Sequence, residues 1–258
     1  MQDKTAVIAG VGPGLGKEVA RLALEAGANV VIGARNVERL ASIAKELDPS
    51  GARVAHAPCD LDRGGDVEPL VSTALGRFDR IDALACVAAR IDITGTIETT
   101  APQAWRDVYE VNVVGTVRVI QAALPALKER GGSIVIVGSQ SEVHPKPAPG
   151  FIAYGAAKAA MHSAMIYMAQ QLGPSGIRVN RVVPSTMWTS TLEGFAAQMA
   201  KDQGASLEEV RRQFETDMPL GQMPTGGDAA EAVAFLLSDR ARSITGQALL
   251  VNSGEWMS

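Results

Sequence analysis

The chain has 258 residues, of which 47% are apolar and 20% are charged, and its formal net charge is −4. This composition is typical of a globular protein with one domain, and the absence of a Lys/Arg block excludes the electrostatic footprint of a nucleic-acid-binding protein. No uncharged apolar run reaches the roughly 18 residues of a membrane span, and the amino-terminal residues lack the layout of a signal peptide. We therefore expect a cytoplasmic protein with no nucleic-acid or membrane partner.

The two cysteines, Cys59 and Cys86, lie in or beside apolar runs. They lack the spacing of metal ligands, so buried thiols are favoured over a disulfide. No metal site is expected.

Short apolar runs alternate along the chain with longer segments of helical period. The strands are predicted at Ala6–Ala9, Val30–Ile32, Val54–Ala57, Ile81–Ala85, Ile134–Val137, Arg178–Val183 and Ala248–Val251. The predicted helices include Gly16–Ala26, Val37–Leu47, Ala104–Glu129, Ala153–Leu172 and Asp228–Leu237. Apolar strands separated by helices are typical of a parallel sheet that is covered on both faces. We predict a single α/β domain, residues 1–258, with a doubly wound (Rossmann-type) sheet that binds ligands at the carboxyl ends of its strands.

Two segments interrupt this alternation. The segment Glu142–Phe151 contains three prolines and is predicted to be a loop after the fifth strand. The segment 186–223 is amphipathic and follows the end of a strand, where it could form a substrate-binding lid. An ordinary helical pair that packs on the core is the alternative.

A glycine-rich turn joins the first strand to the first helix, in the pattern G-x-x-x-G-x-G. Small residues there let the backbone approach a pyrophosphate, and the amino end of the helix supplies N–H donors. The residues predicted to bind a dinucleotide in this turn are Gly10, Gly12, Gly14, Leu15 and Gly16.

The end of the second predicted strand bears on the choice of dinucleotide. A carboxylate about 20 residues past the glycines would bind the ribose 2′-hydroxyl of NAD, whereas an Arg accommodates the 2′-phosphate of NADP. This strand runs into Arg35 and Asn36 without a carboxylate. NADP(H) is therefore favoured and NAD(H) remains possible, with a solvated surface position as the alternative for Arg35.

Tyr154 and Lys158 are four residues apart on a predicted helix and so share one face. A free phenol has a pKa of about 10, and a neighbouring cation is expected to lower that value toward the range useful for proton transfer. A surface Tyr/Lys pair is the alternative. Beside a dinucleotide site, the pair predicts a carbonyl/alcohol oxidoreductase.

With the glycine turn and this pair in place, the chain resembles the short-chain dehydrogenase/reductase family over nearly its whole length. The resemblance implies a catalytic set of Ser139, Tyr154, Lys158 and Asn112, in which Tyr154 transfers the proton and Lys158 binds the nicotinamide ribose. It further implies a homotetramer or homodimer formed through the two longest helices. The other cofactor contacts that it implies are Asp60, Leu61, Ala88, Pro184, Met187 and Thr189.

The chain departs from the family pattern at several positions. Cys86-Val87-Ala88-Ala89 replaces the usual Asn-Asn-Ala-Gly, and Ser185 replaces the Gly that usually follows Pro184. The interval between Ser139 and Tyr154 is longer than usual, which leaves Ser141 as a rival for the catalytic serine.

The substrate is expected to be a hydrophobic or cyclic secondary alcohol or ketone. Candidate substrate contacts are Ser141, His144, Trp188 and Phe195. A catalytically silent dinucleotide sensor and a structural subunit on the same fold remain alternatives, because fold alone does not decide function.

Overall fold

The structure is a computed structural model that describes residues 1–62, 66–145 and 150–257. Seven parallel strands form one sheet in the order β3-β2-β1-β4-β5-β6-β7. Their bounds are β1 Thr5–Ala9, β2 Asn29–Ala34, β3 Val54–Pro58, β4 Ala83–Cys86, β5 Gly132–Val137, β6 Ile177–Pro184 and β7 Ala248–Val251. All seven predicted strands are present, which confirms the doubly wound α/β architecture. From β1 the chain adds β2 and β3 on one side of the sheet, and it adds β4 to β7 on the other side. The strand order therefore switches between β1 and β4, and sheets of this kind bind ligands at that point.

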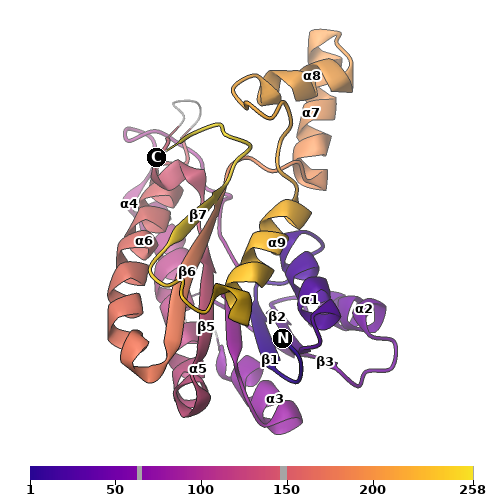
Figure 1. The fold of residues 1–258 in the computed structure, drawn as a ribbon. Coiled ribbons are helices and arrows are strands. Elements are labelled where there is room, and N and C mark those ends of the chain that lie inside the picture. The colour runs from indigo at the N-terminus through magenta and orange to yellow at the C-terminus, as the bar shows by residue number, and fades with distance from the viewer. Residues whose placement is uncertain (63–65, 146–149, 258) are drawn as a thin grey trace.

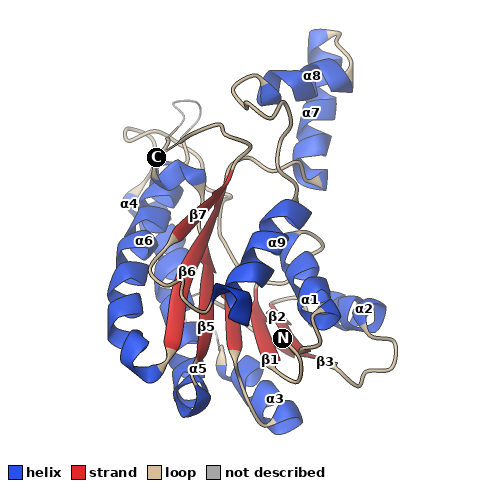
Figure 2. Cartoon of the chain, in the orientation of Figure 1, coloured by secondary structure: helices blue, strands red, loops and turns tan. Residues whose placement is uncertain are grey.

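Helices cover both faces of the sheet (Figures 1 and 2). One apolar layer packs the sheet against α3, α5 and α6, and the other packs it against α1, α2 and α9. The bounds are α1 Leu15–Glu25, α2 Val37–Leu47, α3 Glu68–Phe78, α4 Pro102–Tyr109, α5 Thr116–Arg130, α6 Ile152–Leu172, α7 Ser190–Gln203, α8 Leu207–Glu215 and α9 Gly226–Leu237. Within the described ranges, no helix is long and apolar enough to cross a membrane.

The predicted helix Ala104–Glu129 is interrupted in the structure. A π-helical turn, Glu110–Gly115, separates α4 from α5. At Gly115 a Cβ would lie 2.3 Å from the Leu61 carbonyl oxygen, so the helix approaches the loop after β3 too closely for any other residue. Such single wide turns are frequent at functional sites, and this one carries Asn112.

Helix α3 was not among the predicted helices. It begins next to Pro69 and contains Gly76, and both residues obscure a helical pattern. The predicted loop Glu142–Phe151 begins inside a short 3-10 turn, Gln140–Glu142. The rest of it carries no regular element up to Pro145, while residues 146–149 lie outside the described part of the chain.

Helices α7 and α8 stand apart from the sheet, beyond its carboxyl end (Figure 1). They pack on each other around Ala196, Ala200 and Val210, with partly buried apolar side chains from both helices and from Trp188. The segment leaves and rejoins the body side by side, where Trp188 N donates to the Pro224 carbonyl at 2.9 Å, and Leu220 N donates to the Ser253 carbonyl at 3.2 Å. The pair therefore has an apolar cluster of its own.

Candidate active site

The glycine turn lies at the carboxyl end of β1. Gly10 has φ +102°, and a Cβ there would lie 2.2 Å from the Ala88 nitrogen. At Gly16 a Cβ would lie 2.6 Å from the Gly10 carbonyl oxygen, so these two glycines are required by packing. Gly12 and Gly14 have no atom within 4 Å of the position of a Cβ. The turn is therefore closely packed at Gly10 and Gly16 and has free space at Gly12 and Gly14. This free space lies directly before the amino end of α1, where a pyrophosphate could bind.

A cavity of about 550 Å³ adjoins this turn and is lined by Val11, Ala34, Arg35, Asn36 and Arg39. The Asn36 side chain caps α2 by accepting from Arg39 N at 2.8 Å. Arg35 and Arg39 are exposed, and neither guanidinium makes a hydrogen bond or ion pair with the described residues. Two free cations beside a dinucleotide site fit a 2′-phosphate.

Arg39 was missed by the sequence analysis. The signal was present, because Arg39 follows Arg35 by four residues and lies in the first turn of α2.

Tyr154 and Lys158 lie one turn apart on α6, near its amino end. Lys158 is 3% exposed, and its Nζ donates to the Val137 carbonyl at 2.8 Å, at the end of β5. The same Nζ lies 5.5 Å from the centroid of the Tyr154 ring. Lys158 is therefore buried and Tyr154 is half-buried, an arrangement unlike that of an exposed surface pair.

The protonation of this pair differs from the sequence-based prediction. Burial and, to a smaller extent, the nearby Glu142 carboxylate raise the pKa of Tyr154 to about 12. Burial and, to a smaller extent, the Arg181 guanidinium lower the pKa of Lys158 to about 7. The expectation of a lowered Tyr154 pKa is wrong for the chain alone, because desolvation disfavours the charged form of both groups.

Ser139 and Ser141 lie side by side in the 3-10 turn after β5, with their Oγ atoms 2.9 Å apart. The Ser139 hydroxyl, and not that of Ser141, acts against the rise in the pKa of Tyr154. This interaction favours Ser139 over Ser141 as the hydroxyl next to the reacting oxygen.

Asn112 is 1% exposed and lies in the π-helical turn. Its Nδ2 donates to the carbonyls of Arg90 at 3.0 Å and Val108 at 2.9 Å, and its Oδ1 accepts from Arg90 N at 3.3 Å. The side chain thereby joins the π turn to the segment after β4. Among the described contacts, none links the Asn112 side chain to Lys158.

The other predicted cofactor residues lie along the carboxyl edge of the sheet. Asp60 accepts from Asp62 N at 3.1 Å, Leu61 is buried, and Ala88 N donates to the Ala9 carbonyl at 3.0 Å. Pro184 ends β6, Met187 packs on the α1/α9 layer, and Thr189 caps α7. Ser185 Oγ is buried and has no hydrogen-bond partner within the described ranges. This edge fits a polar ligand.

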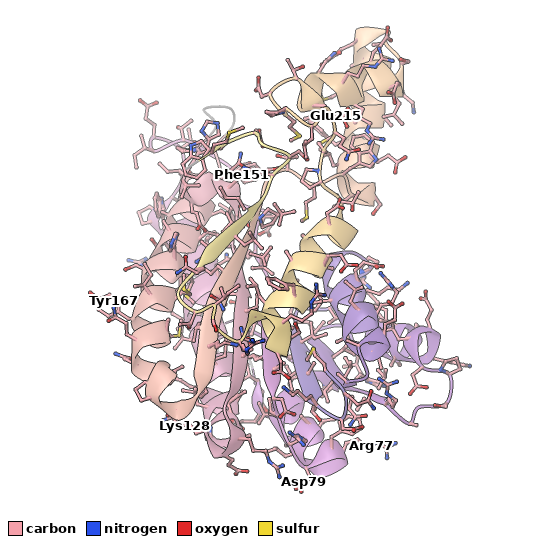
Figure 3. All side chains as sticks on the ribbon, in the orientation of Figure 1. Arg77, Asp79, Lys128, Phe151, Tyr167 and Glu215 are labelled. Carbon is pink, nitrogen blue, oxygen red and sulfur yellow. The ribbon has the colours of Figure 1, made fainter. Side chains whose placement is uncertain are left out.

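The candidate substrate contacts are spread over two regions. The His144 ring stacks on Trp256 near the carboxyl terminus, with centroids 6.5 Å apart. Trp188 packs into the α7–α8 cluster, and the Arg211 guanidinium covers one face of its ring at 5.0 Å. Phe195 is 59% exposed on α7. Phe151, which the sequence analysis missed, lies at the amino end of α6 (Figure 3) and meets the Tyr154 ring edge-on at 6.3 Å.

Both cysteines are buried and free, as predicted. Burial raises the pKa of each thiol to about 12, so neither is a ready nucleophile. In the part of the chain that the structure describes, no group of three or more His, Cys, Asp or Glu side chains could hold a metal ion.

Comparisons with known proteins agree with this architecture. Residues 10–255 match a family model described as "Enoyl-(Acyl carrier protein) reductase". A putative ketoacyl reductase from Streptomyces coelicolor is 31% identical, and the alignment covers 97% of this chain and 96% of that protein. A short-chain dehydrogenase/reductase structure from Brucella melitensis aligns with a TM-score of 0.87 at 29% identity, covering 100% of this chain and 98% of the other.

A structure of a variant actinorhodin polyketide ketoreductase with NADPH aligns equally well. Its TM-score is 0.87 at 29% identity, with 98% of this chain and 97% of that chain covered. The matches extend over nearly the whole chain, and the range of the family model, residues 10–255, spans the glycine turn and the Tyr154–Lys158 helix. The chain therefore belongs to the short-chain dehydrogenase/reductase family of oxidoreductases.

Proposed function

We propose that this protein is an NADP(H)-preferring oxidoreductase that interconverts a secondary alcohol and a ketone. The observation that carries the proposal is the arrangement of the buried Lys158 beside the half-buried Tyr154 and Ser139, at the carboxyl end of β5. A phenol with a pKa of about 12 is protonated at neutral pH and can act as a proton donor. The family relationship supports hydride chemistry at this position.

The residues have separate tasks in the direction of reduction. Tyr154 Oη gives its proton to the carbonyl oxygen of the substrate, and Ser139 Oγ donates a hydrogen bond to the same oxygen as negative charge develops on it. Lys158, in its protonated form, stabilises the phenolate that remains on Tyr154. When bound, the nicotinamide cofactor supplies the hydride. In oxidation the same groups act in reverse.

The cofactor preference rests on the cavity beside the glycine turn. Gly12 and Gly14 leave room for the pyrophosphate, and Arg35 and Arg39 would bind the 2′-phosphate of NADP. A charge-assisted hydrogen bond contributes roughly 1.5–3 kcal/mol, which corresponds to about a tenfold or larger preference for NADPH over NADH. Among the structural neighbours, a polyketide ketoreductase is bound to NADPH and a 3-ketoacyl-(acyl-carrier-protein) reductase to NADH, so the proposed preference rests on the two arginines.

A hydrophobic or cyclic substrate is supported by the surroundings of Tyr154. The Phe151 side chain is 43% exposed beside the tyrosine, and Phe151 itself pairs with Gly95, near the 71% exposed Ile97. The helix pair α7–α8 follows β6 directly and is proposed as the lid over this substrate. The alternative of a helical pair packed on the core is less well supported, since its apolar side chains cluster with each other.

We further propose a homodimer or homotetramer that uses α5 and α6. Tyr167 projects outward from α6 (Figure 3) and is 65% exposed. Ile166 and Val114 are also exposed. Light scattering coupled to gel filtration tests this proposal, and a monomer at micromolar concentration would contradict it.

The first experiment is a fluorescence titration with NADPH and with NADH. We expect NADPH to bind at least ten times more tightly, and Arg35→Ala together with Arg39→Ala to abolish that preference while NADH affinity stays unchanged. Tighter NADH binding would overturn the cofactor preference alone. Binding of neither cofactor would favour the structural-subunit alternative.

The second experiment measures NADPH consumption with a panel of aliphatic, aromatic and cyclic ketones. Tyr154→Phe is expected to reduce kcat by about 10²- to 10⁴-fold with little change in NADPH affinity. Tyr167→Phe is the matched control, because it removes the same hydroxyl from the same helix more than three turns beyond Tyr154, and gel filtration checks that this variant keeps the oligomeric state of the wild type. Cofactor binding without turnover of any ketone would favour the sensor alternative.

A further inference from the structure

A buried ion pair lies directly beneath the catalytic residues. Arg181, from the middle of β6, and Glu142, from the turn that carries the serines, are ion-paired through Arg181 NH2 and Glu142 Oε2. Their side chains are 0% and 1% exposed. Arg181 NH1 also donates to the backbone carbonyl of Lys158 at 3.0 Å. The pair therefore connects β6, the serine turn and the helix of the tyrosine.

Glu142 has two further contacts. Its Oε2 accepts from the backbone nitrogen of Ser139 at 3.4 Å and closes a capping box, in which Ser141 N donates to Ser139 Oγ at 3.3 Å. Its Oε1 lies 3.0 Å from His162 Nδ1, one turn beyond Lys158 on α6. The carboxylate thus holds the backbone of the serine turn against the catalytic helix.

The backbone next to Ser139 is adapted to this pair. At Gly138 a Cβ would lie 2.4 Å from Arg181 NH2 and 3.0 Å from Glu142 Oε2. Glycine is therefore the residue that leaves room for the guanidinium between β5 and the serine turn.

Stability alone does not account for this arrangement. Removing two charges from water is unfavourable, and a buried ion pair is often no more stabilising than apolar residues of the same size. Arg181 Nε is buried and has no hydrogen-bond partner within the described ranges, which adds to the cost. The neighbouring side chains of β6 on this face, Ile177 and Val179, are apolar and fully packed. An apolar residue at position 181 would continue that pattern.

We propose that Arg181 and Glu142 are positioning residues that hold the Ser139 turn against the Tyr154–Lys158 helix and set the electrostatic balance at the tyrosine and the lysine. This inference rests on the proposed function for its kinetic consequence, and on the contacts above for its structural part. Neither residue touches the reacting atoms.

The two charges act on the catalytic groups with opposite signs. Glu142 raises and Arg181 lowers the pKa of Tyr154, and the same holds for Lys158. The charged or titratable side chains that meet Glu142 are Arg181 from β6 and His162 from α6. Removing only the carboxylate therefore favours phenolate, and removing only the guanidinium opposes it.

The test compares Glu142→Gln, Arg181→Met and the double variant in the direction of alcohol oxidation, with kcat measured against pH. One limb of the pH profile of kcat reports the ionisation of Tyr154. We expect this limb to move by about one pH unit to lower pH in Glu142→Gln and by about one pH unit to higher pH in Arg181→Met. In the double variant it should return toward the wild-type position, with kcat at least tenfold lower and NADPH affinity within twofold. Arg178→Met is the matched control, because Arg178 lies on the same strand but donates to carbonyls at the end of α9.

Each single variant leaves one buried charge uncompensated and could fail to fold, whereas the double variant removes both. If only the double variant folds, the proposal is tested by the kcat of that variant. A kcat at least tenfold lower than that of the wild type supports the proposal, and a kcat equal to that of the wild type overturns it. The proposal would also be overturned if all variants, including the control Arg178→Met, lost activity to the same extent and the pH profiles of the two single variants did not shift in opposite directions.

A readout without turnover separates this proposal from the proposed function. The ultraviolet absorbance of tyrosinate, taken as the difference between each protein and its Tyr154→Phe counterpart, reports Tyr154 ionisation directly. A wild-type protein that reduces no ketone would contradict the proposed function. A lower ionisation pH in Glu142→Gln would still support the ion-pair inference, and an unchanged one would overturn it.

Discussion

Replacing Lys158 by Met removes an amine that the fold buries at a cost. Burial lowers the pKa of Lys158 from its ordinary 10.5 to about 7. Between these values the unfolded chain holds a proton that the folded chain has released, so unfolding takes up a proton. The free energy of unfolding of the wild type therefore increases as the pH rises from about 7 toward 10.5, and this increase is absent from the variant.

The magnitude follows from the size of the shift. One pKa unit corresponds to about 1.4 kcal/mol. From pH 7 to pH 9 the wild type should gain about 2 kcal/mol relative to Lys158→Met, after allowing for half protonation at pH 7. The two buried thiols have raised pKa values and change stability in the opposite sense above pH 9. They are present in both proteins and cancel in the difference.

The assay is urea denaturation at pH 7, 8 and 9, with Lys45→Met as the control at an exposed position. Loss of the bond to the Val137 carbonyl shifts the variant by a constant amount, so the slope with pH is the diagnostic quantity. Parallel lines for wild type and Lys158→Met would show that Lys158 stays charged in the fold, and the argument from burial would be refuted.

Three further predictions concern the surroundings of the site. Ser139→Ala should lower kcat by about 10²-fold or more, whereas Ser141→Ala should change it by less than tenfold; the reverse order in a steady-state assay would make Ser141 the catalytic serine. Gly10→Ala should destabilise the protein and abolish NADPH binding, because of its positive φ and the contact with the segment after β4, while Gly12→Ala should alter binding with little effect on the thermal midpoint; equal midpoints would contradict the packing argument. Asn112→Leu leaves buried backbone groups without their partner and should cost roughly 1–3 kcal/mol for each such group in chemical denaturation, and a neutral result would contradict the role of the amide.

The sheet and most of its helices could be predicted from the sequence, because continuous apolar strands alternate with helices of regular period. The same holds for the glycine turn, whose spacing reflects local sterics at Gly10 and Gly16. The π-helical turn could not be predicted, since its cause is a tertiary contact between Gly115 and the Leu61 carbonyl.

The main error of the sequence-based prediction concerned the pKa of Tyr154, which was expected to be lowered and is raised. A Tyr and a Lys four residues apart indicate proximity, but their pKa values depend on how deeply the fold buries them. Arg181 and Glu142 were missed for a related reason. A single Arg in an apolar strand and a Glu beside a proline-rich loop become meaningful only when the fold brings them together. Arg39 could have been found from its spacing to Arg35.

The separate apolar cluster of α7 and α8 bears on local unfolding of this segment and on how far its sequence can change without affecting the sheet. Helices α7 and α8 bury their side chains chiefly against each other. The segment contacts the body near its two ends, at the Trp188–Thr225 bridge and through the Leu220–Ser253 backbone hydrogen bond, so the helices can unfold locally while the sheet stays intact. We expect amide hydrogens of Ser190–Glu215 to exchange with solvent together and earlier than those of β4 and β5. Replacing this segment by another amphipathic helical hairpin should then change the ketone specificity of the enzyme. The refolding of the sheet and the affinity for the dinucleotide should stay unchanged.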